Sequence, residues 1–121
     1  QVSIDYILDE RARELFAEEF RKTELTRIAF IMAEKGFNGY SVENFSEKNF
    51  WYDRTVAKNE FYKAGDILWG TNIFKISPFH VLWPIPASAI DSNQGGTINQ
   101  NKGYIGYEKN IPPLTVIDDQ Q

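Results

Sequence analysis

Residues 4–16 read IDYILDERARELF, and this stretch decides the fold. Its apolar side chains recur every three or four positions, at Ile4, Leu8, Ala12 and Leu15. That spacing is typical of one face of an α-helix. Asp9 and Arg13 stand four residues apart, acidic residue first, which is the order that favours a helix. The stretch predicts a first helix over residues 3–18, with Leu15 in the core.

A second helix is predicted over residues 24–35. Its apolar residues also follow a helical period, at Leu25, Ile28, Ala29 and Met32. Gly36 is a suitable residue to end this helix, and Asn38-Gly39 is a turn signal. Two helices joined by a tight connection form an αα-hairpin, and we expect Leu25 to lie in its core.

The remainder of the chain divides into one further helix and a less regular region. Ser46 is a good N-cap residue and predicts a third helix over 46–62. Beyond it, Gly70 and Pro78 interrupt apolar stretches, and short strands are expected at 73–76 and 81–83. The predicted fold is mainly α. It comprises a helical part over 1–62 and an extended, irregular part with short strands over 63–121.

Composition excludes several classes of function. The 121 residues carry a net charge of −4, whereas a nucleic-acid-binding protein needs a concentrated basic surface. The chain has no cysteine, so it has neither disulfides nor thiolate metal sites. A calcium loop beginning at Asp91 would need a ligand where Gly95 stands and a glutamate where Lys102 stands. We therefore predict no metal, no cofactor and no nucleic-acid partner, and interpret the lone His80 as a hydrogen-bonded packing residue.

Three separated motifs carry a family resemblance. They are Glu10 to Arg21 followed by Glu24-Leu25-Thr26-Arg27, then Leu82-Trp83-Pro84-Ile85-Pro86, then Ile98-Asn99-Gln100-Asn101-Lys102-Gly103-Tyr104. In this order they resemble the C-terminal portion of the SusD/RagB family, from about Ile7 to Leu114. The family usually has Gly where Glu19 stands and Asp where Glu24 stands. The whole chain, 1–121, is interpreted as a C-terminal segment of such a protein.

The resemblance implies a binding role and no enzymatic activity. SusD/RagB proteins are nutrient-binding lipoproteins on the outer surface of Gram-negative bacteria, and their helical half is built from tetratricopeptide-like hairpins. The whole protein would capture a glycan and deliver it to a SusC-like TonB-dependent transporter. Its lipid anchor would lie in an N-terminal region absent from this chain. The alternative is a helical protein–protein interaction scaffold, and a carbohydrate hydrolase would need a distinct carboxylate pair that the sequence does not show.

Two sets of residues have expected roles, one structural and one in ligand binding. The first is expected to be structural and consists of Glu14, Arg21, Arg27, Trp83, Pro84 and Pro86. Its charged members would pair helices rather than catalyse a reaction, and Trp83 before Pro-x-Pro would pack on the helices, with sugar stacking as the alternative. The ligand-binding residues are unknown, and the candidates are Trp51, Tyr52 and Trp69, although packing in the core or against the rest of the protein is the favoured interpretation of these three. Trp51 and Tyr52 are adjacent on a predicted helix, so one should be buried and the other more exposed.

Overall fold

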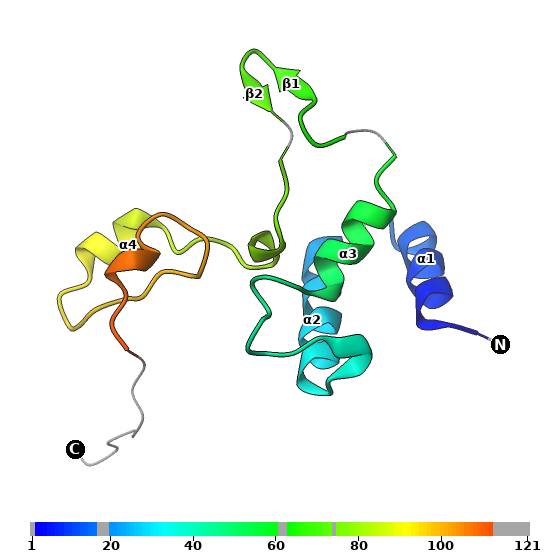
Figure 1. Ribbon diagram of the computed structural model, residues 1–121, viewed down its shortest axis with the longest axis horizontal. Coiled ribbons are helices and arrows are strands. Elements are labelled where there is room, and N and C mark those ends of the chain that lie inside the picture. Colours follow the sequence, from blue (N-terminus) through cyan, green and yellow to red (C-terminus); the bar gives the residue numbers. More distant parts are fainter. Residues whose placement is uncertain (1, 17–19, 61–62, 74, 113–121) are drawn as a thin grey trace. The chain divides into compact units, whose positions relative to one another are not determined.

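The computed structural model describes residues 2–16, 20–60, 63–73 and 75–112. The chain divides into two compact units, residues 1–81 and residues 82–121. Figure 1 shows the first unit's helices α1 (Ile4–Glu14), α2 (Arg21–Glu34) and α3 (Phe50–Ala57). The first unit also holds strands β1 (Ile67–Trp69) and β2 (Asn72–Ile73), and helix α4 (Ala87–Ser92) belongs to the second unit. The predicted fold class, mainly helical with an irregular C-terminal region, is confirmed.

The first two helices form as the apolar spacing indicates, with different limits. α1 begins after Ser3, whose hydroxyl accepts a hydrogen bond from the Tyr6 N–H at 3.2 Å. It ends at Glu14, four residues before the predicted end, and residues 17–19 lie outside the described residues. α2 begins at Arg21, three residues earlier than predicted. The predicted stop is correct, because Gly36 has φ +66° just beyond the helix and glycine adopts that conformation without strain.

α3 begins at Phe50, not at the predicted Ser46, because Asn49 is its N-cap. The Asn49 Oδ1 accepts from the Tyr52 N–H at 2.9 Å, while its Nδ2 donates to the carbonyls of Phe45 and Pro78. This side chain is fully buried, so its three hydrogen bonds fix both the helix start and the later segment at Pro78. α3 ends at Ala57, short of the predicted 62, and residues 61–62 lie outside the described residues.

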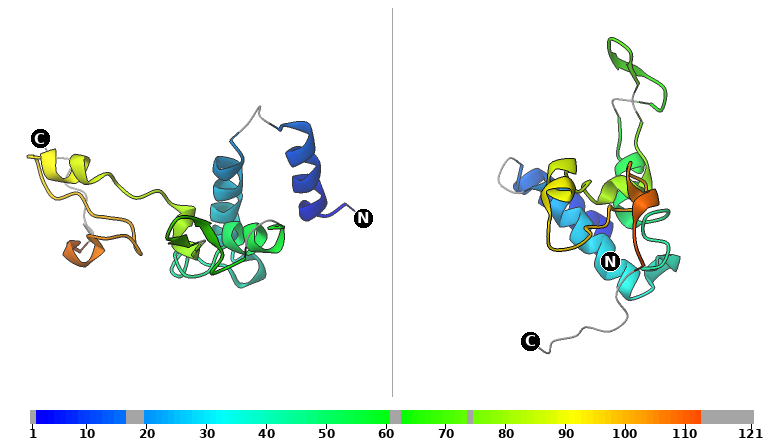
Figure 2. Two further views of the ribbon diagram at one scale, coloured as in Figure 1. Left: turned by 90° about the horizontal axis from the view of Figure 1, so that it is seen from above. Right: turned by 90° about the vertical axis from the view of Figure 1, so that its left-hand side faces the viewer.

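The core of the first unit lies between α2, α3 and the turns that follow them. Its buried apolar side chains are Leu8, Leu25, Ala29, Met32, Ala33, Tyr40, Phe45, Trp51 and Val81. The prediction for Leu25 is thus confirmed. Leu15 is only half-buried, because it is the C-cap of α1 and lies past the last helical turn. α1 contributes one fully buried side chain, Leu8, so most of its attachment to the other helices must come from polar groups. Figure 2 (left) shows α1 and α2 side by side.

The strands occur at other positions than predicted. β1 and β2 pair antiparallel, with Ile67 opposite Ile73 and Trp69 opposite Asn72. The expected strand at 73–76 is therefore wrong at residues 75 and 76, and residue 74 lies outside the described residues. The expected strand at 81–83 is also wrong, because residues Pro78–Val81 form a 3-10 helix. There the Ser77 N–H donates to His80 Nδ1 at 2.9 Å, so His80 is hydrogen-bonded as expected.

The second unit is held by side-chain amides rather than by a sheet. Gln100 is buried; its Nε2 donates to the Ile85 carbonyl at 2.9 Å, and its Oε1 accepts from the Ile85 N–H at 2.8 Å. Asn101 and Tyr104 donate to the carbonyls of Trp83 and Leu82. Because the flanking prolines have no N–H, these side chains supply the partners that a neighbouring strand would otherwise provide. The motifs at 82–86 and 98–104 therefore belong together as one structural unit.

Trp83 was expected to pack on the helices of the first unit, and it belongs to the second unit. The Trp83 side chain is 71% exposed, and its main-chain carbonyl is the part engaged by Asn101. Pro84 and Pro86 are exposed too, and Pro86 immediately precedes the short helix α4. The indole ring of Trp83 was expected to hold this motif in place. Within the second unit, the main-chain carbonyls of Leu82 and Trp83 accept hydrogen bonds from the side chains of Tyr104 and Asn101, and these bonds fix the backbone path.

Candidate binding surface

Trp51 is unavailable to a ligand. Its side chain is 6% exposed, and the Lys22 ammonium lies 5.0 Å from the centre of its ring in a cation–π contact. The same ammonium donates to the Val81 carbonyl at 2.7 Å, and burial lowers the Lys22 pKa. Thr26 donates to that carbonyl as well. The candidate Trp51 is therefore an internal packing residue that joins α2, α3 and the end of the first unit.

Tyr52, the next residue on α3, lies on a different side of the helix and is half-buried. This confirms the expectation that the two adjacent aromatic residues separate. Tyr52 lines a hollow of about 630 Å³ between the end of α3 and the segments that flank the β-hairpin. The hollow has an apolar part formed by Tyr52, Val56 and Ile76, and a charged rim. A cavity of this size falls within the range of small-molecule sites.

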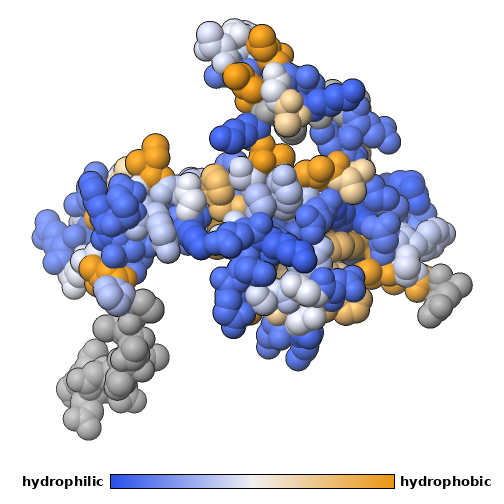
Figure 3. All heavy atoms as spheres, in the orientation of Figure 1, coloured by the Kyte–Doolittle hydropathy of each residue, from blue (hydrophilic) through white to orange (hydrophobic). Residues whose placement is uncertain are grey.

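Trp69 is the most accessible of the three candidates. It ends β1 at the turn of the hairpin, and its side chain is 80% exposed. Gly70 follows with φ +60°, a conformation that glycine adopts readily and that turns the chain into β2. Ile67 and Ile73, which are opposite each other in the strand pair, are exposed as well. Figure 3 shows apolar surface on this hairpin.

The predicted ion-pair network exists with partly different members. Glu24 is 8% exposed and lies between two guanidinium groups, since Arg21 Nη1 donates to it at 2.7 Å and Arg11 donates to its other oxygen. Arg21 Nη2 also donates to the Leu8 carbonyl at 2.7 Å, which joins α1 to α2. Burial raises the Glu24 pKa, but the hydrogen bonds from Arg11 and Arg21 outweigh this, and the net pKa is lowered. Glu24 therefore remains ionised.

Two of the charged residues in the predicted network lie outside it. Glu14 and Arg27 are exposed, and neither makes an ion pair within the described parts of the chain. Sequence reasoning included Arg21 and missed Glu24 and Arg11. The spacing of Arg21 and Glu24, three residues apart at the start of a helix, was the available signal for that pair.

A second ion-pair network joins α1 to α3. The buried Arg54 guanidinium donates to Asp5 and, at 2.6 Å, to Asp9, and the Lys58 ammonium donates to Asp9 at 3.0 Å. The hydrogen bond from Lys58 is the largest effect on the Asp9 pKa, which is lowered. Sequence reasoning missed this network. The available signal was an arginine three positions after Trp51, on the buried face of α3.

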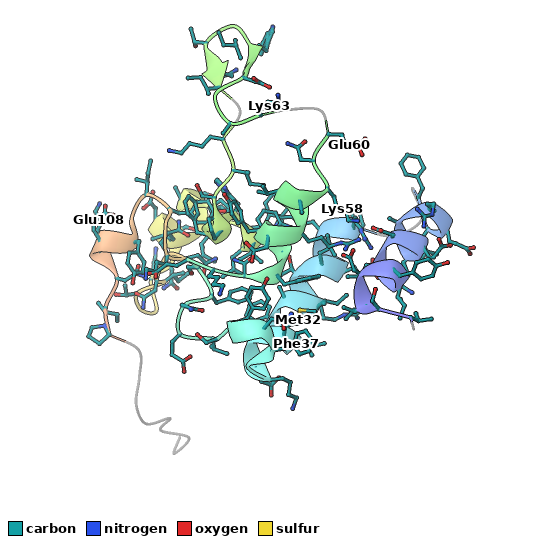
Figure 4. All side chains as sticks on the ribbon, turned by 45° about the vertical axis from the view of Figure 1, so that its right-hand side comes forward. Met32, Phe37, Lys58, Glu60, Lys63 and Glu108 are labelled. Carbon is teal, nitrogen blue, oxygen red and sulfur yellow. The ribbon has the colours of Figure 1, made fainter. Side chains whose placement is uncertain are left out.

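Among the described residues no group of three or more His, Asp and Glu side chains could hold a metal ion. The charged side chains of Glu24 and Arg54 are engaged in ion pairs between helices. Figure 4 shows the side chains along the chain that leaves α3, where Lys58, Glu60 and Lys63 are labelled.

No helix within the described ranges combines the length and the apolar character needed to cross a membrane.

Comparisons with known proteins identify one family. Residues 1–104 match the family model described as the SusD family. Neither the curated proteins nor the solved structures contain a match. The matched range covers all three motifs from which the resemblance was drawn.

Proposed function

The chain belongs to the SusD family of non-catalytic binding proteins, and we propose that it is the C-terminal segment of a cell-surface glycan-binding lipoprotein. The full-length protein captures an oligosaccharide outside the cell and delivers it to a SusC-like TonB-dependent transporter in the outer membrane. It is anchored to the outer membrane by lipid and faces the outside of the cell. The family match over residues 1–104 is the observation that carries the proposal.

Within this role, Trp69 is the residue proposed to contact the glycan. An indole ring provides a large, rigid, apolar surface, and little conformational entropy is lost when a ligand covers it. Of the three candidate aromatic residues, Trp51 is covered by Lys22, and Tyr52 is half-buried. Trp69 is 80% exposed at a turn, where binding residues are common.

The segment that returns from the hairpin is anchored to the helices. The Pro78 carbonyl accepts from Asn49, and the Val81 carbonyl accepts from Lys22 and Thr26. The helices are in turn joined by the ion pairs of Glu24 and Arg54. A binding loop that rises from a fixed base loses less entropy on association than one that does not, so the helical part serves as its support.

The alternative function, a helical interaction scaffold, is favoured by one observation. α1 exposes apolar side chains that include Ile4 and Ile7, and Phe16 just beyond its end is 84% exposed. Exposed apolar side chains of this kind are found at protein–protein contacts. A scaffold would bind a protein partner through this face, and it would not need a glycan ligand.

A glycan array probed with the full-length protein tests the proposal. We expect binding to a restricted set of oligosaccharides, together with co-purification of an outer-membrane transporter barrel. Co-purification of a protein partner with no glycan bound at any array position would favour the scaffold and contradict the proposed function.

A further inference from the structure

The hollow beside α3 has more lysines than carboxylates in its lining. It is lined by Lys58, Lys63 and Lys75 and by one carboxylate, Glu60, although the whole chain has a net charge of −4. Lys58 is already neutralised, because its ammonium donates to Asp9 at 3.0 Å and lies 3.6 Å from Asp5. Lys63 and Lys75 therefore determine the charge that a ligand would meet.

The ammonium groups of Lys63 and Lys75 make no ion pair within the described residues. Both residues are exposed. The nearby Asp66 carboxylate accepts a hydrogen bond from the Lys63 main-chain N–H at 2.7 Å, and it forms no ion pair with either ammonium group. Two lysines thus remain against the single carboxylate Glu60, and the rim has an excess of positive charge.

The same hollow offers an apolar wall. Tyr52 and Val56 come from α3, and Ile76 follows the hairpin. The Tyr52 ring is half-buried, so its position is restrained by packing while part of it faces the hollow. Sugars combine an apolar ring face with polar groups at the edge, and an aromatic wall beside cationic side chains matches a sugar that bears a negative charge.

We propose that this hollow is a subsite for an anionic sugar unit, a saccharide that carries a carboxylate or a sulfate group. The inference rests on the proposed glycan-binding function and specifies its ligand class. The sugar ring lies on Tyr52, and its anionic group accepts charge-assisted hydrogen bonds from Lys63 and Lys75. Lys63 precedes β1 and Lys75 follows β2, so the hairpin that carries Trp69 starts and ends at the rim of this subsite.

Titration of the full-length protein with three soluble probes tests the inference. The probes are oligogalacturonides for the carboxylate, sulfated chondroitin oligosaccharides for the sulfate, and malto-oligosaccharides as neutral sugars. We expect one anionic probe to bind at least about tenfold more tightly than the neutral one, a ratio equal to roughly 1.4 kcal/mol. The Lys63→Gln/Lys75→Gln variant should lose most of that preference. The matched control Lys35→Gln/Lys109→Gln, which removes two exposed lysines elsewhere, should retain it.

Four other outcomes would overturn the subsite, and the last of them would also contradict the proposed function. Equal loss in both double variants would show a non-specific effect of net charge and would overturn the subsite. Tight binding of malto-oligosaccharides, unchanged by Lys63→Gln/Lys75→Gln, would overturn the subsite and leave the glycan-binding function intact. Oligoglutamate is added as a control that carries no sugar, and its binding as tightly as the anionic sugars would show ion exchange in place of sugar recognition and would overturn the subsite. No binding to any saccharide would contradict both the subsite and the proposed function.

Discussion

Replacing Glu24 with glutamine is expected to loosen the attachment of α1 to α2. Glu24 is 8% exposed, and it accepts hydrogen bonds from Arg11 and Arg21. In the Glu24→Gln variant, two guanidinium groups face a neutral amide. Breaking a buried ion pair by removing one partner costs about 3–5 kcal/mol. Because the side chains of Arg11 and Arg21 are 40% and 32% exposed, solvent compensates part of this cost, and about 2 kcal/mol is expected.

Urea denaturation followed by helical circular dichroism measures this cost. With a denaturant slope of about 1–3 kcal/mol per molar urea, a loss of 2 kcal/mol lowers the midpoint by roughly 1 M. The matched control is Glu14→Gln, which changes an exposed glutamate of α1 and should shift the unfolding free energy by no more than about 0.5 kcal/mol. Equal midpoints for the two variants would refute the assignment of Glu24 as the central residue of the network.

The pH dependence gives an independent check on the same residue. Burial raises the Glu24 pKa, and the hydrogen bonds from Arg11 and Arg21 lower it by more, so the folded-state pKa lies below the unfolded one. Its stabilising contribution is therefore complete above the unfolded pKa of about 4.3 and is lost as the pH falls below it. The difference in stability between the wild type and Glu24→Gln should shrink over that acidic range. A difference that does not change with pH would contradict an ionised Glu24.

Three further predictions concern other parts of the chain. Gln100→Ala removes the side-chain partners of Ile85, and hydrogen exchange at the Ile85 amide should become at least roughly tenfold faster, whereas an unchanged rate would contradict the amide pairing. Burial, together with the hydrogen bond to Asp53, raises the pKa of Tyr40 to about 12. The stability that this residue contributes is complete below the unfolded pKa of about 10 and is lost as the pH rises toward the folded value. Burial raises the pKa of Tyr104 too, so an ultraviolet titration should show late tyrosines, of which Tyr40 is the one that Asp53→Asn shifts to lower pH. Acrylamide should quench Trp51 least of the three tryptophans, and equal quenching in single-tryptophan variants would contradict its burial.

The sequence predicts those parts of the structure that depend on neighbours along the chain. The helical spacing at Leu25 and the stop at Gly36 are local signals, and both predictions are correct. The start of α3 was misplaced because the Asn49 side chain is fixed by Pro78, 29 residues away. The residues that hold the Trp83 motif were missed for a similar reason. They include amide side chains such as Gln100, whose partners no local pattern identifies.

Prediction of the candidate binding surface from the sequence is limited in the same way, because it depends on residues far apart in the chain. The sequence predicted that Trp51 and Tyr52 separate, because adjacent helical residues point in different directions. It did not indicate which one is buried, since that depends on Lys22 and α2. The ion pairs of Arg54 join residues 45 and 49 positions apart and could not be located from spacing alone. Trp69 lies at the turn between β1 and β2, and its exposure follows from that position.

The central claim is that this chain contributes a glycan contact through Trp69. Isothermal titration of the full-length protein with its best array ligand tests it most directly, in the wild type and in the Trp69→Ala variant. Trp83→Ala is the matched control, because it also removes an exposed indole. We predict that Trp69→Ala weakens binding at least about tenfold, equal to roughly 1.4 kcal/mol, while Trp83→Ala leaves the affinity unchanged. Unchanged affinity in Trp69→Ala, with the fold intact by circular dichroism, would contradict the account.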